Sequence, residues 1–232
     1  MLIAIIGAME EEVELLSSSL TAKKTSAIRH LTVFEGKLHQ HDVALVQSGI
    51  GKVASAIATS LIIDNYQPDL VINTGSAGGY DKSLNIGDIV VADRLIHHDI
   101  DLTHFGYELG QASRMPLSYE TDKEFTQLAI NAAKFIDGIT TKMGLICSGD
   151  SFIGREDQAE LVRRNFPTMK AVEMEAASIA QVCFMMSTPS VVIRSLSDIA
   201  GKESPITFEQ YLKVAAKNSA NLVMHLIKSI QS

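Results

Sequence analysis

Cysteine is scarce in this chain, and an excess of basic charge is missing. Only Cys147 and Cys183 occur, they form no CxxC pair and their neighbours are apolar, so we expect buried, unreactive thiols. The formal net charge of -7 repels phosphate backbones and anionic lipid headgroups. Nucleic acid and membranes are therefore not expected as partners, and a small molecule is.

Long apolar runs are also absent, and none approaches the length of a membrane span. The opening MLIAIIGAMEEE has a short apolar run and acidic residues where a secretory leader carries basic ones. We therefore expect a cytoplasmic protein. The hydrophobic content of 46% can fill the core of one domain over residues 1–232, because no stretch interrupts the apolar periodicity as a linker would.

Short apolar runs alternate with longer segments of helical spacing. Strands are expected at residues 2–6, 32–38, 43–47, 70–73, 89–91, 144–147, 171–174 and 191–193, and helices at residues 9–20, 52–66, 122–136, 156–165, 176–185 and 208–230. This order predicts a single-domain, three-layer α/β/α fold. Its central sheet is expected to be mixed and largely parallel, with a hairpin at residues 32–47 as an antiparallel portion.

Six segments of polar or small residues follow these predicted strands. They are residues 7–12, 48–51, 75–79, 148–153, 173–175 and 194–198. In open α/β sheets, ligands bind outside the carboxyl ends of the strands. We therefore expect the six segments to share one crevice.

The glycine-rich turn at residues 49–54 superficially matches the GxGxxA fingerprint of dinucleotide-binding folds. No acidic residue stands at the end of a second strand about twenty positions later, since Asp64 lies on a predicted helix and Asp69 opens the next strand. A nucleoside triphosphate loop fails too, because Val46 occupies the position of its first glycine. Tight strand-to-helix turns explain each glycine cluster equally well, and no cofactor is expected.

Carboxylates stand at three of the predicted strand ends. Alone, Glu12 fits the favourable interaction of acidic residues with a helix amino terminus, and an arginine paired with a carboxylate would explain Glu173, Glu175, Arg194 and Asp198. Because carboxylates are expected at three strand ends of one crevice, a functional role explains them better than three unrelated structural roles do. Spacing alone does not tell which carboxylate acts as acid, base or ligand.

The run at residues 97–101 offers histidine and aspartate, which are metal-ligand types. Along an extended strand only His97, Asp99 and Asp101 share a face, and no second cluster of histidine or cysteine accompanies them. A metal is therefore the less favoured interpretation.

The stretch containing Phe105, Tyr107, Met115 and Pro116 is too apolar for an ordinary exposed loop. It predicts either a lid or a subunit contact. Simple packing against the next helix is the alternative.

Seven motifs together resemble one family along nearly the whole chain. They are GAMEEEV at 7–13, SGIGKV at 48–53, NTGSAGG at 73–79, FGYELGQ at 105–111, SGDSFI at 148–153, AVEMEA at 171–176 and RSLSD at 194–198. The chain resembles the bacterial 5'-methylthioadenosine/S-adenosylhomocysteine nucleosidases of the nucleoside phosphorylase superfamily. The resemblance implies irreversible hydrolysis of these nucleosides to adenine and a thioribose, with 5'-deoxyadenosine as a further substrate and no cofactor or metal.

The resemblance also implies roles for single residues. Asp198 matches the acid that protonates adenine N7, and Glu12 matches the residue that binds and deprotonates the attacking water. Glu175 and Met174 match residues at the ribose, with Glu175 accepting the 2' and 3' hydroxyl hydrogens. This pairing agrees with the two carboxylates that glycosidases use, one as acid and one as base.

Further substrate-binding residues follow from the same motifs. Ser76 and Arg194 match polar groups near the water and the sugar, Phe152 stacks on the purine, and the Ile153 backbone reads the purine edge. The alkylthio pocket is expected to have Met9, Ile50 and Phe208 as walls, and Phe105 and Pro116 of the neighbouring subunit of a homodimer are expected to complete it. The remaining candidates are Ala77, Gly78, Glu173 and Ser197.

Two other functions stay open on the residues. A phosphorolytic relative would use phosphate in place of water and would need cations and bare backbone amides to hold it. The acidic run Glu10, Glu11 and Glu12 after the first glycine turn favours water. A non-catalytic nucleoside-binding protein on the same fold is the second alternative, and the presence of all three carboxylates speaks against it.

Overall fold

The computed structural model describes residues 1–200 and 204–231. Its strands are β1 Leu2–Gly7, β2 Thr21–Ile28, β3 Leu31–Leu38, β4 His41–Gln47, β5 Leu70–Gly79, β6 Ile89–His97, β7 Tyr119–Glu120, β8 Thr141–Ser148, β9 Ala171–Glu173 and β10 Ser190–Ile199. Its helices are α1 Glu10–Ser19, α2 Lys52–Tyr66, the single turn η1 Thr103–Phe105, α3 Lys123–Ala133, α4 Glu156–Asn165, α5 Ala176–Met185 and α6 Ser204–Ser229.

Within the described residues, ten strands form one mixed sheet. Parallel pairings join β1 to β4 and β5, β5 to β10, and β8 to β6 and β9. Antiparallel pairings join β5 to β9, β6 to β10 and β7, and β3 to β2 and β4. The strands β5, β10, β6, β8 and β9 therefore form a closed circuit, and β1, β4, β3 and β2 extend from it as an open wing.

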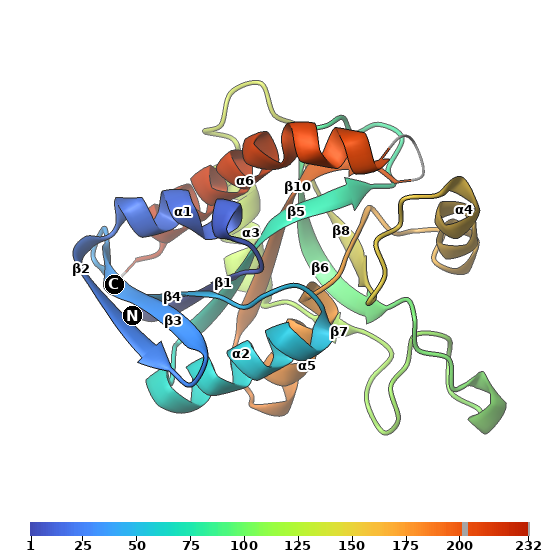
Figure 1. Cartoon of the computed structure of the whole chain (residues 1–232), viewed down its shortest axis with the longest axis horizontal. Coiled ribbons are helices and arrows are strands. Elements are labelled where there is room, and N and C mark those ends of the chain that lie inside the picture. The colour runs from blue at the N-terminus through green and yellow to red at the C-terminus, as the bar shows by residue number, and fades with distance from the viewer. Residues whose placement is uncertain (201–203, 232) are drawn as a thin grey trace.

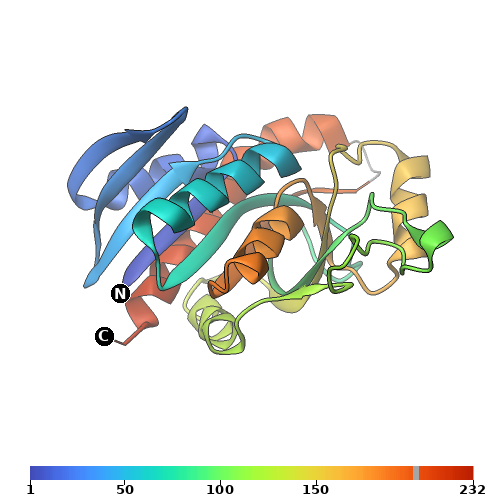
Figure 2. The same ribbon diagram turned by 90° about the horizontal axis from the view of Figure 1, so that it is seen from below.

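Helices cover both faces of the sheet, as Figures 1 and 2 show. One core cluster packs α1, α3 and α6 against one face, with Leu16, Ile72 and Leu226 fully buried in it. A second cluster packs α2 and α5 against the other face, around Ile6, Ile62 and Ile179. The predicted three-layer fold with a mixed sheet is confirmed, and antiparallel pairing is more extensive than the sequence indicates.

The sequence prediction fails where two strands carry small or polar residues. β5 was expected to end at Asn73 and continues through TGSAGG to Gly79, with all ten residues buried. β10 was expected to end at Ile193, and Arg194 to Asp198 lie within it. Small side chains let neighbours come close here, since a Cβ on Gly79 would lie 2.7 Å from the Leu196 side chain. The glycine cluster is therefore strand rather than turn.

The amino-terminal wing also differs from expectation. β2 was not predicted, because its residues are mostly exposed and polar and show no buried alternation. It pairs with β3 at the edge of the sheet, far from the closed circuit.

Two composition-based expectations can be compared with the structure. Cys147 and Cys183 are both buried and free, as predicted. No helix in the described part of the chain combines the length and the apolarity needed to cross a membrane.

Candidate active site

A cavity of about 250 Å³ opens where β1, β4, β5, β8, β9 and β10 bring their functional segments together. It is lined by Ala8, Met9, Glu12, Ile50, Ser76, Ala77, Gly78, Ser151, Phe152, Ile153, Val172, Glu173, Met174, Glu175, Ser197, Asp198 and Phe208. All six segments expected to share a crevice therefore converge there, although two of them are parts of strands.

Glu12 sits on the first turn of α1 with only 3% of its surface exposed. Its Oε2 accepts the backbone N–H groups of Ala8 at 2.8 Å and Met9 at 3.2 Å. Its Oε1 accepts the backbone N–H of Ser76 at 2.9 Å and the Ser76 hydroxyl at 3.0 Å. Four donors from two segments thus converge on one carboxylate and fix its orientation.

Gly75 permits this arrangement. A Cβ at this position would lie 2.6 Å from Glu12 Oε1, closer than such atoms can approach. Any side chain on Gly75 would therefore displace the Glu12 carboxylate from its donors. Glycine at this position lets the Glu12 carboxylate come close to β5. Its backbone is extended, so β5 continues through it.

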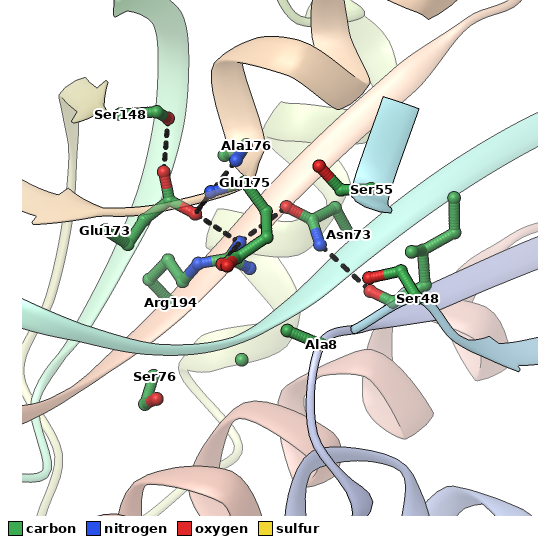
Figure 3. Close-up of polar contacts among 12 residues, drawn as sticks. Ala8, Ser48, Ser55, Asn73, Ser76, Ser148, Glu173, Glu175, Ala176 and Arg194 are labelled. Atoms are coloured by element: carbon green, nitrogen blue, oxygen red, sulfur yellow. Dashed lines mark hydrogen bonds and ion pairs between the residues drawn. The ribbon is translucent and has the colours of Figure 1, made fainter. Parts of the chain in front are cut away.

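Beneath the cavity lies a buried ion pair between Arg194 of β10 and Glu173 of β9 (Figure 3). The Nη2 to Oε2 distance is 2.7 Å, and the side chains are only 2% and 3% exposed. The same Nη2 donates to Asn73 Oδ1 at 2.7 Å, and Asn73 Nδ2 donates to the Ile6 carbonyl of β1 at 2.9 Å. One guanidinium thus joins three strands of the sheet.

The Glu173 carboxylate is fully engaged by the protein. Its Oε1 accepts the hydroxyl of Ser148, and its Oε2 also accepts the backbone N–H groups of Glu175 and Ala176 at 2.9 and 2.8 Å, at the start of α5 (Figure 3). Burial raises the pKa of Glu173, but the Arg194 guanidinium and these hydrogen bonds outweigh it and leave that pKa lowered. Glu173 therefore lines the cavity with a carboxylate that the protein itself already engages.

Glu175 is in a different electrostatic environment. Burial and the neighbouring Glu173 charge raise its pKa to about 8, although Arg194 and the Gly51 N–H act in the opposite direction. Its Oε1 accepts that N–H at 2.8 Å, and its Oε2 lies 4.0 Å from Arg194 Nη2. Gly51 has φ of +95°, a backbone region that favours glycine and that aims its N–H at the carboxylate.

Asp198 lies near the end of β10, and 2% of its surface is exposed. The Ser197 hydroxyl donates to its Oδ1 at 3.0 Å. A Cβ added to Gly78, its partner across β5, would lie 3.3 Å from Oδ2. The carboxyl group thus faces a stretch of β5 that carries no side chain.

The outer part of the cavity is apolar. Phe152 and Phe208 meet edge to face, with ring centroids 5.7 Å apart, and Phe152 keeps 43% of its surface exposed. Ile50 is 58% exposed, and Met9 is half-buried. An inner group of carboxylates with an apolar, aromatic mouth suits a ligand with a polar core and an apolar end.

Three predicted site residues do not line the cavity. Arg194 lies beneath it and acts through Glu173 and Asn73. Phe105 on η1 is 73% exposed, and Pro116 is half-buried; both belong to the segment that protrudes from the body after β6 (Figures 1 and 2). Neither residue is among those that line the cavity of its own chain.

Several residues that build the site were not singled out from the sequence. Ala8, Ser151 and Val172 line the cavity, while Asn73, Ser148 and Gly51 hold the charged side chains. A polar Asn73 at the end of an apolar strand was a usable signal, because a buried amide needs partners. Backbone donors such as Ala8 leave no side-chain signature.

The structure also bears on the metal hypothesis. His97 Nε2 lies 2.9 Å from Gln181 Oε1, Asp99 pairs with Lys52, and Asp101 accepts from Thr103. Within the described residues, no group of three or more histidine, cysteine, aspartate or glutamate side chains is arranged to hold a metal ion.

Comparison with known proteins gives one consistent result. The model of the phosphorylase superfamily matches residues 2–228. The 5'-methylthioadenosine/S-adenosylhomocysteine nucleosidase of Psychromonas ingrahamii is 51% identical over 230 residues, covering 99% of this chain and all of the relative.

Solved structures agree closely with this fold. The nucleosidase of Neisseria meningitidis in complex with methylthio-immucillin-A is 43% identical, covers 99% of both chains and has a TM-score of 0.97. That of Colwellia psychrerythraea in complex with adenine is 50% identical, covers 98% of this chain and 95% of the other, and also has a TM-score of 0.97.

The buried ion pair leads to a stability prediction. Glu173→Gln leaves the Arg194 guanidinium buried without its partner, so the free energy of unfolding should fall by about 3 kcal/mol. Urea unfolding measures this change. The matched control is Glu120→Gln, which breaks an exposed pair with Lys123 at 4.0 Å and should cost less than about 0.5 kcal/mol. Equal losses in the two variants would contradict the structural role of Glu173.

Proposed function

The chain belongs to the phosphorylase superfamily and, within it, to the 5'-methylthioadenosine/S-adenosylhomocysteine nucleosidases, a family of N-glycosidic hydrolases; from this we propose the reaction that its own site performs. The substrates are 5'-methylthioadenosine and S-adenosylhomocysteine, with 5'-deoxyadenosine as a further one. Water cleaves the bond between adenine and the ribose, giving adenine and the 5-thio-substituted sugar.

The engagement of Glu12 by four donors is the observation that carries this proposal. Phosphorolysis needs backbone amides and cations to hold phosphate, and here the amides of Ala8, Met9 and Ser76 already hold a carboxylate. No lysine or arginine stands among the described residues that line the cavity. Phosphate would therefore be repelled by the Glu12 carboxylate, whose surrounding amides are already engaged, whereas an uncharged water can donate a hydrogen bond to that carboxylate.

Asp198 supplies the proton in the proposed mechanism. Adenine leaves more easily when its N7 is protonated, because the base then departs without negative charge. Asp198 is buried at the inner wall and receives a hydrogen bond from Ser197, which orients its carboxyl group. The purine stacks on Phe152, and the Ile153 backbone contacts its edge.

Glu12 activates the attacking water. Of its four donors only the Ser76 hydroxyl can rotate, so Ser76 can give up its position to a water without moving the backbone. The other three donors keep the carboxylate in place while it takes the proton. Positive charge that develops on the sugar is stabilised by Glu12 and Glu175.

Glu175 and Met174 bind the ribose. Two hydroxyl hydrogens on the 2' and 3' positions would favour the ionised form of Glu175, against the burial and the Glu173 charge that raise its pKa. Arg194 acts from beneath, at 4.0 Å from the Glu175 carboxylate. Met9, Ile50 and Phe208 then receive the apolar 5' substituent, with Ala77, Gly78 and Ser197 completing the wall.

We also propose that the chain works as a cytoplasmic homodimer. Large apolar side chains are exposed on both α2 and α5, at Val53 and Ile57 on the first and Phe184 and Met185 on the second, which is typical of surfaces that other proteins cover. The protruding Phe105 and Pro116 would reach across this contact. They would close the mouth of the neighbour's cavity beside Ile50.

Phosphate independence is the first test. Adenine release from 5'-methylthioadenosine and S-adenosylhomocysteine should proceed at the same rate with and without phosphate, because the amide donors are occupied by Glu12. A coupled assay for adenine measures the rate, and chromatography identifies the sugar product. A requirement for phosphate with formation of a sugar 1-phosphate would indicate a phosphorylase, and binding without release would indicate a non-catalytic protein.

The acid assignment has its own test. Asp198→Asn should lower kcat about 10²- to 10⁴-fold, the usual contribution of a general acid, while adenine nucleosides still bind. Steady-state kinetics and calorimetry measure the two quantities. Asp64→Asn, an exposed change on α2, is the control and should behave like the wild type. Unchanged turnover in Asp198→Asn would remove the acid assignment.

The shared pocket can be tested by mixing subunits. Phe105→Ala should raise KM for 5'-methylthioadenosine about tenfold through lost apolar contact, while Phe135→Ala, at a similarly exposed residue that follows α3 and stacks on His225 of α6, should not. Mixed dimers of Phe105→Ala with Asp198→Asn should regain normal KM, because the intact Phe105 then serves the site with the intact acid. No recovery on mixing, or a monomer by light scattering, would contradict the proposal.

A further inference from the structure

Asp99 follows β6 in the run of histidine and aspartate that has no part in the chemistry above. Its Oδ1 lies 2.6 Å from Lys52 Nζ, and its Oδ2 accepts the backbone N–H of Asp150 at 2.9 Å. Asp150 Oδ1 in turn accepts the backbone N–H of Lys52 at 2.7 Å. Lys52, Asp99 and Asp150 therefore form a closed triangle, in which each residue contacts the other two.

The three members of this triangle come from three different segments of the chain. Lys52 opens α2 after the turn that follows β4, and Asp150 lies in the loop after β8. None of the three lines the cavity, but their neighbours do: Ile50 lies two residues before Lys52, and Phe152 two residues after Asp150. The triangle thus links the apolar wall at Ile50 to the aromatic wall at Phe152.

Partial burial strengthens these contacts. The Lys52 and Asp99 side chains are 19% and 29% exposed, whereas the Lys37 and Asp42 pair at a similar distance is 53% and 62% exposed. Burial raises the pKa of Asp99, but the hydrogen bonds from Lys52 and Asp150 outweigh it and lower that pKa. The carboxylate therefore stays charged, and a charged, partly desolvated acceptor holds its donors more firmly than a surface pair does.

The loop that carries Asp99 is itself locked to the loop after β8. The His98 N–H donates to the Ser148 carbonyl at 2.8 Å, and the His98 ring packs on Gly149, where an added Cβ would lie 2.4 Å from it. These contacts hold the two loops against each other. Lys52 joins the start of α2 to both loops, through its backbone N–H to Asp150 and its side chain to Asp99.

We propose that Asp99 is a positioning residue that sets the separation between the Ile50 wall and the Phe152 wall of the nucleoside pocket. This inference rests on the proposed function, because the two walls receive the 5' substituent and the purine. A nucleoside contacts both walls at once and depends on their separation. Free adenine contacts only the Phe152 wall, so its binding does not depend on Asp99.

Steady-state kinetics and calorimetry test this role. Asp99→Asn and Lys52→Met should each raise KM for 5'-methylthioadenosine about tenfold, with kcat and the Kd for adenine changed less than about threefold. The double variant should be no worse than either single one, because both changes break the same pair. A merely structural defect would lower the thermal midpoint without separating the nucleoside from adenine.

Asp42→Asn is the matched control, since it also removes a carboxylate paired with lysine, far from the cavity in the β3–β4 hairpin. It should keep the wild-type KM. A wild-type KM in Asp99→Asn, or equal weakening of nucleoside and adenine binding, would overturn the proposal. If the wild type released no adenine, the proposed function would fail, and the Kd for 5'-methylthioadenosine would replace KM in the same comparison.

Discussion

The ion pair between Arg194 and Glu173 is the contact on which the rest of the site depends. Through Asn73 it ties β10 to β5 and β1, and through Ser148 it ties β9 to β8. The same Glu173 carboxylate accepts the first amides of α5, so it also fixes where Glu175 emerges. A buried pair of this kind costs desolvation, and its geometry must be good to repay that cost. Here its shared hydrogen bonds position five strands and one helix.

Backbone N–H groups hold the carboxylates in and around the pocket. Backbone amides at Ala8, Met9 and Ser76 point to Glu12, and the amides at Gly51 and Lys52 point to Glu175 and Asp150. These are the groups that bind anions in many other proteins. Because carboxylates of the protein occupy these amides, they are not available to an external anion, and a neutral nucleophile does not need them. In the proposed mechanism this occupation favours water over phosphate.

Periodicity predicted the regular elements well. The helices over residues 52–66, 156–165 and 176–185 have the bounds expected from the sequence. Their apolar residues recur at helical spacing and pack against the sheet, so the local pattern and the tertiary structure agree. The prediction failed at β5 and β10, where glycine and buried polar residues continue a strand. Three carboxylates could be placed at strand ends, but their division of roles could not be derived from spacing. Ser148 and Gly51 lie in segments expected at the crevice, but neither they nor Asn73 could be given a role, because their importance lies in what they contact across the fold.

The closed circuit of five strands explains why the failures and the site coincide. β5 pairs with β1 at residues 70–73 and continues along β10 and β9, and there a Cβ on Gly75 would lie 2.6 Å from Glu12, one on Gly78 3.3 Å from Asp198 and one on Gly79 2.7 Å from Leu196. The absence of side chains there leaves space that Glu12 and Asp198 enter from α1 and β10. A stretch that local rules assign to a turn is therefore the part of the sheet that admits the carboxylates. Rules based on local sequence fail at residues 74–79 because the small residues there serve contacts with distant residues, Glu12 and Asp198, and not a turn.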